Sequence, residues 1–306
     1  MPDSGFSVRS CQESGRRYAI FYAACPSLSR SRILKIECPR LEFASLSDQG
    51  RVRALNEDAT AVDRNHGIAV VADGMGGHRA GEVASRMALD IVVDRLRRKV
   101  LRFRAGAGQA MPLQFARQIV GEANKAIHSA ARKQAGCNGM GTTLALALFH
   151  GRQVALLHVG DSRIYRLRGG RLQLLTRDDS LLRDQVELGL IAAEDAGESH
   201  NRHLVTQALG IAPRVHVHRQ EKSVQSGDVF LLCTDGLTDL VEEADIELIV
   251  DALKTNLPLA ASHLVQLAND NGGYDNITVA LVRVLDDEPA SGRKGWISRL
   301  LGWLAP

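Results

Sequence analysis

The hydrophobic pattern divides the chain into a β-rich start, two helices, a second β-rich block and a mixed end. Residues 41–47 alternate apolar and polar side chains, residues 59–62 are a short apolar run and residues 67–72 a continuous one, so three successive strands are predicted. Apolar residues then recur at helical spacing over residues 81–104 and 113–135. Two long amphipathic helices are therefore expected after the first strands.

The second β-rich block contains T-T-L-A-L-A-L-F, Q-V-A-L-L-H-V, R-I-Y-R-L and R-L-Q-L-L. It is interrupted at His150-Gly151, Gly160-Asp161 and Gly169-Gly170, and such tight turns predict antiparallel hairpins. The remaining predicted elements are strands at 215–217, 229–233 and 277–284 and helices at 242–253 and 259–270. Because this order is not the alternation of a doubly wound parallel sheet, we predict an α+β fold, an antiparallel β sandwich covered by helix pairs in four αββα layers.

One charged insert interrupts this pattern. Residues 178–197 lie between the second β-rich block and the strand predicted at 215–217, with a short helical pattern around residues 181–190. The insert is rich in charge and ends in glycine, which is typical of a mobile lid. We expect a flap here.

The two ends of the chain differ from the domain predicted at residues 41–285. Residues 1–40 are rich in Ser and Arg and lack sustained periodicity, which predicts a disordered extension. Their apolar patch, residues 18–25, is at the lower limit for a signal-peptide core and follows a long polar lead, so secretion is disfavoured. Residues 286–306 read as a linker and an apolar tail, with an apolar face formed by Trp296, Ile297, Leu300, Leu301, Trp303 and Leu304. This tail is either a docking or membrane-surface helix or a segment that folds back onto the domain.

Composition excludes several classes of protein. The chain has 306 residues, of which 45% are hydrophobic and 24% charged, as in ordinary soluble domains. Lys and Arg exceed Asp and Glu by 38 to 35, which is not the basic surface that nucleic acid requires. No stretch approaches the ~20 apolar residues of a membrane-spanning helix. The five cysteines form no C-x-x-C pair and are odd in number, which favours a reduced cytoplasmic setting.

Five aspartates lie close to apolar runs. They are Asp58 in N-E-D-A, Asp73 in A-D-G-M-G-G-H, Asp161 in V-G-D-S-R, Asp235 in T-D-G-L-T-D and Asp275 in G-Y-D-N-I-T. Four follow an apolar run directly or within a few residues, and Asp275 precedes one. A β scaffold lines up carboxylates at strand ends in this way, and hard divalent cations bind several carboxylate oxygens. The pattern predicts a metal-dependent enzyme.

The motifs R-x-x-N-E-D-A, D-G-M-G-G-H, G-T-T, G-D-S-R, T-D-G-L-T-D and D-N-I-T occur in this order. Together they resemble the bacterial branch of the metal-dependent protein phosphatases, the type 2C class, which dephosphorylates serine and threonine. The resemblance covers about residues 42 to 285. One D-G motif alone is weak evidence because that dipeptide is common in turns, whereas six ordered motifs are specific.

The resemblance implies a centre of two Mn²⁺ or Mg²⁺ ions. Asp73 would bridge both ions, the carbonyl of Gly74 would bind one, and Asp235 and Asp275 would hold the other. Shared carboxylates offset the repulsion between two close cations, and such a pair activates a water and polarises phosphoryl oxygens. Asp161 would support a weaker third ion; the alternative is that it caps a tight turn between strands.

Further roles follow from the same resemblance. Glu57 and Asp58 would hold metal-bound waters, and Arg53 would bind the phosphate, for which a planar guanidinium offers paired donors. Arg51 lies close to Arg53 in sequence and could be confused with it. The alternative for either arginine is that it is a solvated surface side chain with no part in binding phosphate.

One position departs from the family. Eukaryotic members carry a histidine proposed as general acid two residues after the bridging aspartate, where this chain has Met75, which cannot donate a proton. His78 is the candidate proton donor. The alternatives are that His78 only begins a helix near the metal centre and that water protonates the leaving group.

We therefore predict a protein serine/threonine phosphatase in which water attacks phosphorus without a covalent enzyme intermediate. The alternatives are a non-catalytic module of the same fold that binds phosphoproteins, and a phosphatase of small molecules. Clustered carboxylates repel one another without metal, which favours the enzyme. The expected partners are substrates of a cognate Ser/Thr kinase, chosen through the flap. We expect a cytoplasmic monomer, with contact to the membrane surface if the tail docks there.

Overall fold

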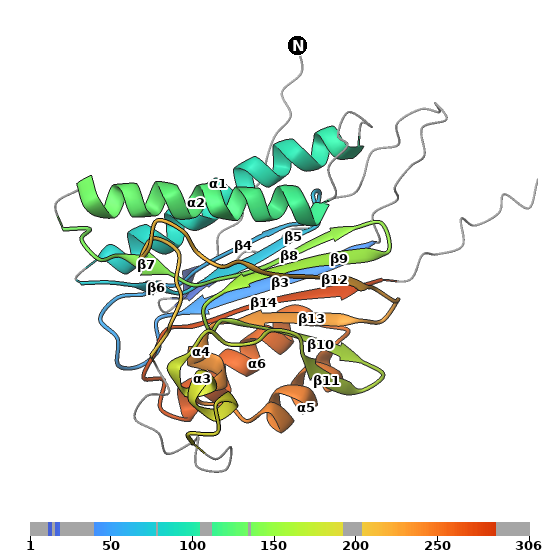
Figure 1. The fold of residues 1–306 in the computed structure, drawn as a ribbon. Coiled ribbons are helices and arrows are strands. Elements are labelled where there is room, and N and C mark those ends of the chain that lie inside the picture. Colours follow the sequence, from blue (N-terminus) through green and yellow to red (C-terminus); the bar gives the residue numbers. More distant parts are fainter. Residues whose placement is uncertain are drawn as a thin grey trace, which may run out of the picture.

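The computed structural model describes residues 12–13, 16–18, 40–77, 79–104, 112–133, 136–191 and 204–285. Two antiparallel sheets pack face to face, and helices cover the outer face of each, which gives four αββα layers (Figure 1). The α+β sandwich predicted from the order of elements is confirmed.

The smaller sheet lies beneath the two long helices. Its strands, in spatial order, are β12 (His218–Ser223), β9 (Gln153–Val159), β8 (Leu144–His150), β5 (Ile68–Ala72) and β4 (Ala59–Asp63). Helices α1 (Ala80–Arg104) and α2 (Pro112–Lys133) pack on its outer face, against strand residues that include Ile68 of β5 and Leu146 of β8. Every residue of β5 is buried, because one face meets these helices and the other meets the second sheet. This explains why β5 is a continuous apolar run rather than an alternating one.

The larger sheet has the spatial order β1-β2-β3-β14-β13-β10-β11. These strands are β1 (Gln12–Glu13), β2 (Arg16–Tyr18), β3 (Leu41–Asp48), β14 (Ile277–Val284), β13 (Val229–Cys233), β10 (Arg163–Arg168) and β11 (Arg171–Leu174). Its outer face is covered by α5 (Glu243–Leu253) and α6 (Leu257–Asp270). The remaining elements are the ribbon of β6 (Gly74–Met75) and β7 (Gly141–Thr142) and the short helices α3 (Leu181–Glu187) and α4 (Asp235–Thr238).

Two expectations about strands need correction. The turn at Gly160-Asp161 is not a hairpin, because β9 and β10 belong to different sheets and the chain crosses between them there. A glycine-containing turn looks the same in sequence whether it joins paired strands or separate sheets. The strand predicted at 215–217 is also wrong, since the strand is β12, whereas Val215 and Val217 pack against the helix-covered core. The hairpins β8–β9 and β10–β11 are confirmed.

The N-terminal segment contributes two strands that the pattern did not predict. β2 pairs with β3 through Arg17 opposite Ser47 and Tyr18 opposite Leu46, and β1 pairs with β2. Strands of two or three residues are too short to show a period. The disorder predicted for the rest of residues 1–39, the linker and tail at 286–306, and the end of the flap at 192–197 lie outside the described residues.

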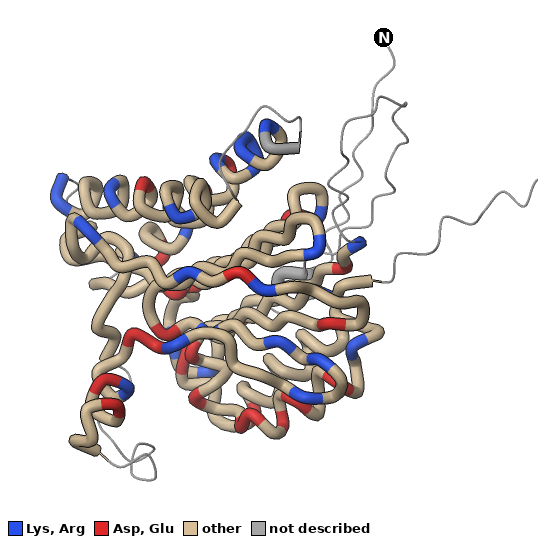
Figure 2. Tube along the Cα trace, turned by 45° about the vertical axis from the view of Figure 1, so that its right-hand side comes forward, with Lys and Arg blue, Asp and Glu red and all other residues tan. Residues whose placement is uncertain are grey.

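Charge is distributed over the whole described surface. Acidic and basic residues are interspersed, and Lys and Arg are most closely spaced toward the C-terminal end of α1 (Figure 2). Arg95 and Arg97 in this region pair with Glu122 and Asp63. Within the ranges given above, no helix is both long enough and apolar enough to span a bilayer.

The space between the sheets is filled by apolar side chains, among which Phe149 and Phe230 pack edge to face with ring centroids 5.3 Å apart. Replacing Phe149 by Ala is expected to lower the free energy of unfolding by about 3–5 kcal/mol, since a buried ring is replaced by a cavity. Urea unfolding followed by circular dichroism measures this. Leu248→Ala on exposed α5 surface is the control, with an expected change within about 0.5 kcal/mol. A loss below about 1 kcal/mol for Phe149→Ala would show that the sheets collapse around the vacancy.

Candidate metal centre

The aspartates predicted as site residues lie at one end of the sandwich. Asp73 directly follows β5, and Asp161 and Asp235 come two residues after β9 and β13, whereas Asp58 and Asp275 come just before β4 and β14. Because neighbouring strands are antiparallel, the end of one strand and the start of the next meet at the same edge. The topology therefore brings together five carboxylates that are up to 217 residues apart in sequence.

The electrostatics show that these carboxylates interact. Burial raises the pKa of Asp73 well above its usual value, and repulsion from Asp58, Asp235 and Asp161 raises it further. The pKa of Asp161 is raised well above its usual value by burial, and also by Asp235 and Asp178. Such mutual repulsion favours either protonation or a bound cation.

Asp58 is a buried carboxylate, with 8% of its surface exposed. Its Oδ2 accepts a hydrogen bond of 2.9 Å from Thr234 Oγ1, and its Oδ1 is buried without a hydrogen-bond partner in the described structure. Burial raises the pKa of Asp58 to about 7, although hydrogen bonds from Thr278 and Thr234 oppose the shift. An unpartnered buried oxygen of this kind can accept from a water or approach a cation.

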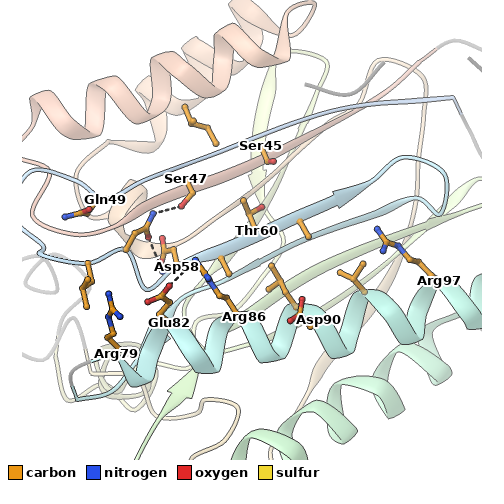
Figure 3. Close-up of a pocket in the computed structure, with 17 residues that line it drawn as sticks. Ser45, Ser47, Gln49, Asp58, Thr60, Arg79, Glu82, Arg86, Asp90 and Arg97 are labelled. Carbon is orange, nitrogen blue, oxygen red and sulfur yellow. Dashed lines mark hydrogen bonds and ion pairs between the residues drawn. The ribbon is translucent and has the colours of Figure 1, made fainter. Parts of the chain in front are cut away.

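Asp58 also lines a polar groove between α1 and the strands β3 and β4, with a volume of about 760 Å³. Figure 3 shows Asp58 close to Ser47 of β3, with Glu82 and Arg86 projecting from α1 on the other side of the groove. Glu82 and Arg86 form an ion pair of 3.0 Å. The groove next to Asp58 is therefore lined by polar and charged side chains as well as by apolar residues of the core.

The backbone of Asp73 is fixed by the G-T-T motif. Its N–H donates to Thr143 Oγ1 at 2.9 Å, and its carbonyl accepts from the N–H of Thr143 at 2.9 Å and from Thr142 Oγ1 at 2.8 Å. The Thr143 hydroxyl also shares a hydrogen bond of 2.7 Å with Ser162, the residue after Asp161. Thr143 thus links the backbone of Asp73 to Ser162, a role that the sequence prediction did not assign.

The glycines next to two aspartates are required by close backbone contacts. A Cβ at Gly74 would lie 2.1 Å from the carbonyl oxygen of Gly81 and 2.5 Å from that of Glu57. A Cβ at Gly236 would lie 2.0 Å from the carbonyl oxygen of Asn276. The D-G dipeptides therefore let the chain segments approach closely around the carboxylates.

Glu57 faces the start of α1. Its Oε1 accepts a hydrogen bond of 3.2 Å from the N–H of Gly81, and burial raises the pKa of its carboxyl group. Helix N-termini stabilise carboxylates because free N–H groups point toward them. Glu57 thus connects the N-E-D segment to the helix that follows the D-G-M-G-G loop.

Arg53 is the cation at the edge of the cluster. Its Nη2 lies 2.7 Å from Asp275 Oδ2, and 53% of its side chain is exposed. The hydrogen bond to Asp275 raises the pKa of Arg53, as do the charges of Asp73 and Asp235. Arg51 instead lies beside Gly273, to whose carbonyl its backbone N–H donates at 2.6 Å. The structure thus brings Arg53 to the carboxylates and separates the two arginines.

Asn276 organises the loop that carries Arg53 and Glu57. Its Oδ1 accepts from the N–H of Glu57 at 2.8 Å, and its Nδ2 donates to the carbonyls of Gln49 and Leu55 at 2.9 Å each. Sequence reasoning quoted D-N-I-T and assigned no role to this asparagine. The signal was available in the residue type, since an amide side chain can pair with both donors and acceptors of a buried loop.

Asp161 lies on the side of the cluster next to α3. It is 7% exposed and lines a cavity of about 270 Å³ between α3 and the carboxylate cluster, together with Asp235, Asp239 and Asp178. Arg163 binds the Asp178 carboxylate through two nitrogens, at 2.9 and 2.7 Å. Met75 lies in β6, and the proposed proton donor His78 lies outside the described residues.

These residues suit hard divalent cations. Among the side chains that the structure describes, no three of His, Cys, Asp or Glu surround one point as a complete metal site. Mg²⁺ and similar ions keep several waters and need only one or two carboxylates each. Mutually repelling carboxylates, the unpartnered Asp58 oxygen and the close backbone approach at Gly74 fit ions held partly through water.

Comparison with known proteins agrees with this geometry. The family model described as protein phosphatase 2C matches residues 49–267. The serine/threonine phosphatase Stp of Listeria monocytogenes is 39% identical over 239 residues, covering 77% of this chain and 93% of the relative. The serine/threonine protein phosphatase PstP of Mycobacterium tuberculosis is 36% identical over 247 residues, covering 80% of this chain and 45% of the relative.

Solved structures show the same fold. The M. tuberculosis PstP/Ppp structure has a TM-score of 0.72 and 34% identity and covers 80% of this chain and 99% of the relative. The PstP catalytic domain in complex with two manganese ions has a TM-score of 0.70 and 34% identity, with the same coverage. The resemblance found in the motifs is therefore confirmed, and the chain belongs to the bacterial branch of the protein phosphatase 2C family of metal-dependent serine/threonine phosphatases.

Proposed function

We propose that this enzyme removes phosphate from phosphoserine and phosphothreonine in proteins at the carboxylate cluster described above. The observation that carries the proposal is the Arg53–Asp275 contact, which places an anion-binding guanidinium against carboxylates suited to cations. A phosphate ester requires both, because its negative oxygens are held by positive groups while metal ions polarise them.

Different carboxylates would bind different ions of a Mn²⁺ or Mg²⁺ pair. Asp73 would be shared between two ions, the Gly74 carbonyl would bind one, and Asp235 and Asp275 would bind the other. When bound, the ions supply an activated water and polarise the phosphoryl oxygens. Glu57 and Asp58 would orient water ligands, a role that the unpartnered Asp58 Oδ1 supports.

Arg53 would hold the phosphate. A guanidinium has five N–H donors, and the contact with Asp275 uses Nη2, so donors are left for a phosphate oxygen. The Asn276 amide fixes the backbone around Arg53, which limits the freedom lost when substrate binds. Protonation of the leaving oxygen by His78 or by water stays a prediction, since Met75 has no proton to donate.

The alternatives are weaker on the same observations. A module that only binds phosphoproteins has no use for repelling buried carboxylates, and a small-molecule phosphatase has no need of the flap. We further propose that the flap selects proteins phosphorylated by a cognate Ser/Thr kinase and that the enzyme is a cytoplasmic monomer. The apolar and basic residues of the tail support docking at a membrane surface.

Replacing Asp73 by Asn should lower phosphopeptide turnover by more than roughly a hundredfold and weaken manganese binding, because a neutral amide cannot hold two divalent ions together. Phosphate release and calorimetric manganese binding measure the two effects. Asp270→Asn on exposed α6 surface is the control and should leave both unchanged. Substantial turnover by Asp73→Asn with saturating manganese would rule out a shared Asp73.

The protein stripped of metal by a chelator should lose stability as pH rises from 5 to 8. Folded Asp58 has a pKa of about 7 against the ordinary 3.8, so the folded state binds more protons than the unfolded state in this window and stability falls with rising pH. The full shift of the Asp58 pKa corresponds to about 4 kcal/mol in the free energy of unfolding. Urea unfolding at several pH values measures the slope, which Asp58→Asn should reduce. Equal slopes for the two proteins would place the Asp58 pKa near its ordinary value.

Asp161→Ala should lower phosphopeptide turnover while two tightly bound ions remain, because Asp161 is not among the residues proposed to hold those ions, although it lines a cavity beside α3 with Asp235. A third ion held by one carboxylate and waters binds weakly, so the wild-type advantage should grow with manganese concentration. Calorimetric stoichiometry and turnover are measured together. If the variant keeps wild-type turnover and metal dependence, Asp161 only serves the turn.

A further inference from the structure

Asp179 is a buried carboxylate at the base of the flap that the proposed chemistry does not use. It is 2% exposed, and its two oxygens have different partners. Oδ2 accepts a hydrogen bond of 3.0 Å from the N–H of Gly160, and Oδ1 lies 2.7 Å from Nε2 of His218. The carboxylate thus joins the residue before Asp161 to strand β12.

The backbone of Asp179 strengthens the same connection. Its N–H donates to the carbonyl of Gly160 at 3.0 Å, and its carbonyl accepts from the N–H of Thr206 at 2.7 Å. The next residue, Ser180, caps α3 and forms a bridge with Val205. We call the segments on the two sides of the flap, residues 176–181 and 204–209, its stems; they meet at Asp179, which also contacts Gly160.

The second stem reaches the other side of the metal centre. Leu209 exchanges two backbone hydrogen bonds with Thr142, of 3.0 and 2.8 Å. Thr142 Oγ1 in turn donates to the carbonyl of Asp73. The described contacts thus connect the base of the flap to the backbone at Asp73 and at Gly160, next to Asp161, and those at Gly160 include the Asp179 side-chain carboxylate.

His218 is itself supported from β9. The His158 ring stacks on His218 with centroids 4.6 Å apart, and His158 Nε2 lies 2.7 Å from the carbonyl oxygen of Arg177. A carboxylate held by two partners in a buried place occupies a defined position. Because the Gly160 N–H donates to this carboxylate, the position of Asp179 also fixes Gly160 and the turn that carries Asp161.

We propose that Asp179, oriented by His218, is a positioning residue that couples the base of the flap to the Asp161 turn. The consequence for catalysis rests on the third-ion role proposed for Asp161. While Asp179 keeps its contacts with both stems and with Gly160, the Asp161 carboxylate stays at the cavity that it shares with Asp235. When these contacts are lost, the turn and the Asp161 carboxylate become more mobile together.

The test compares Asp179→Ala, Asp161→Ala and the double variant in phosphopeptide turnover over a range of manganese concentrations. Asp179→Ala should raise the half-saturating manganese concentration about tenfold, the effect of one charge-assisted hydrogen bond, with two tightly bound ions retained. If Asp179 acts through Asp161, the double variant should match Asp161→Ala. Losses that multiply in the double variant would overturn the proposal.

Hydrogen exchange on the metal-free proteins supplies a readout that does not depend on turnover. Asp179→Ala should speed exchange of the Gly160 and Thr206 amides at least about tenfold, whereas unchanged exchange at Gly160 would overturn the coupling. If Asp161→Ala has no effect on metal dependence but Asp179→Ala still speeds exchange at Gly160, the coupling stands and the catalytic role of Asp161 fails.

Two further variants complete the design. Glu221→Ala removes the pair with His150, an acid–histidine contact of 3.0 Å between β12 and the end of β8 away from the metal centre, and should keep wild-type exchange at Gly160 and wild-type metal dependence. If Asp179→Ala fails to fold, His218→Ala keeps the carboxylate and releases one oxygen. His218→Ala should then speed amide exchange at Gly160 and raise the half-saturating manganese concentration, each by less than Asp179→Ala is expected to. Wild-type values of both quantities would overturn the proposal.

Discussion

The repulsion between carboxylates at one end of the sandwich is the constraint on which the rest of this structure depends. Burial raises the pKa of Asp58, Asp73 and Asp161, and the charge of Asp235 raises the pKa of all three further, so the scaffold holds these carboxylates against a force that would separate them. Two sheets with fixed registers supply the stiffness, since each carboxylate lies near the end of a paired strand. Threonine hydroxyls and the Asn276 amide then fix the backbone locally.

Much of the fold was predictable because its central strands are distinct apolar runs and its long helices span enough residues to show a helical period. The exceptions have physical causes. β12 is polar at every position because it lies at a sheet edge, so no apolar run marked it. The crossing at Gly160 looked like a hairpin because a turn's sequence reports local backbone shape and not which sheet receives the next strand.

The candidate site was predictable where chemistry is carried by residue type and position in a motif. The aspartates and Arg53 do converge, and Arg53 rather than Arg51 reaches Asp275. What sequence could not show are the contacts between distant segments: Asn276 with the loop at residues 49–57, the threonines at 142 and 143 with Asp73, and Asp179 with Gly160. These depend on the three-dimensional path of the chain, and each involves a common polar residue with many other uses.

The polar edge strand β12 has a consequence for how copies of the protein meet. An edge strand offers unpaired N–H and C=O groups on which another chain can extend the sheet. The sequence of β12 is H-R-Q-E-K-S, so a second copy that paired there would bring ionic side chains into register and strip them of water. The apolar Val217 directly precedes β12 and is buried in the core beneath the helices. This arrangement discourages sheet-to-sheet aggregation at the side of the sandwich where the smaller sheet would otherwise be open.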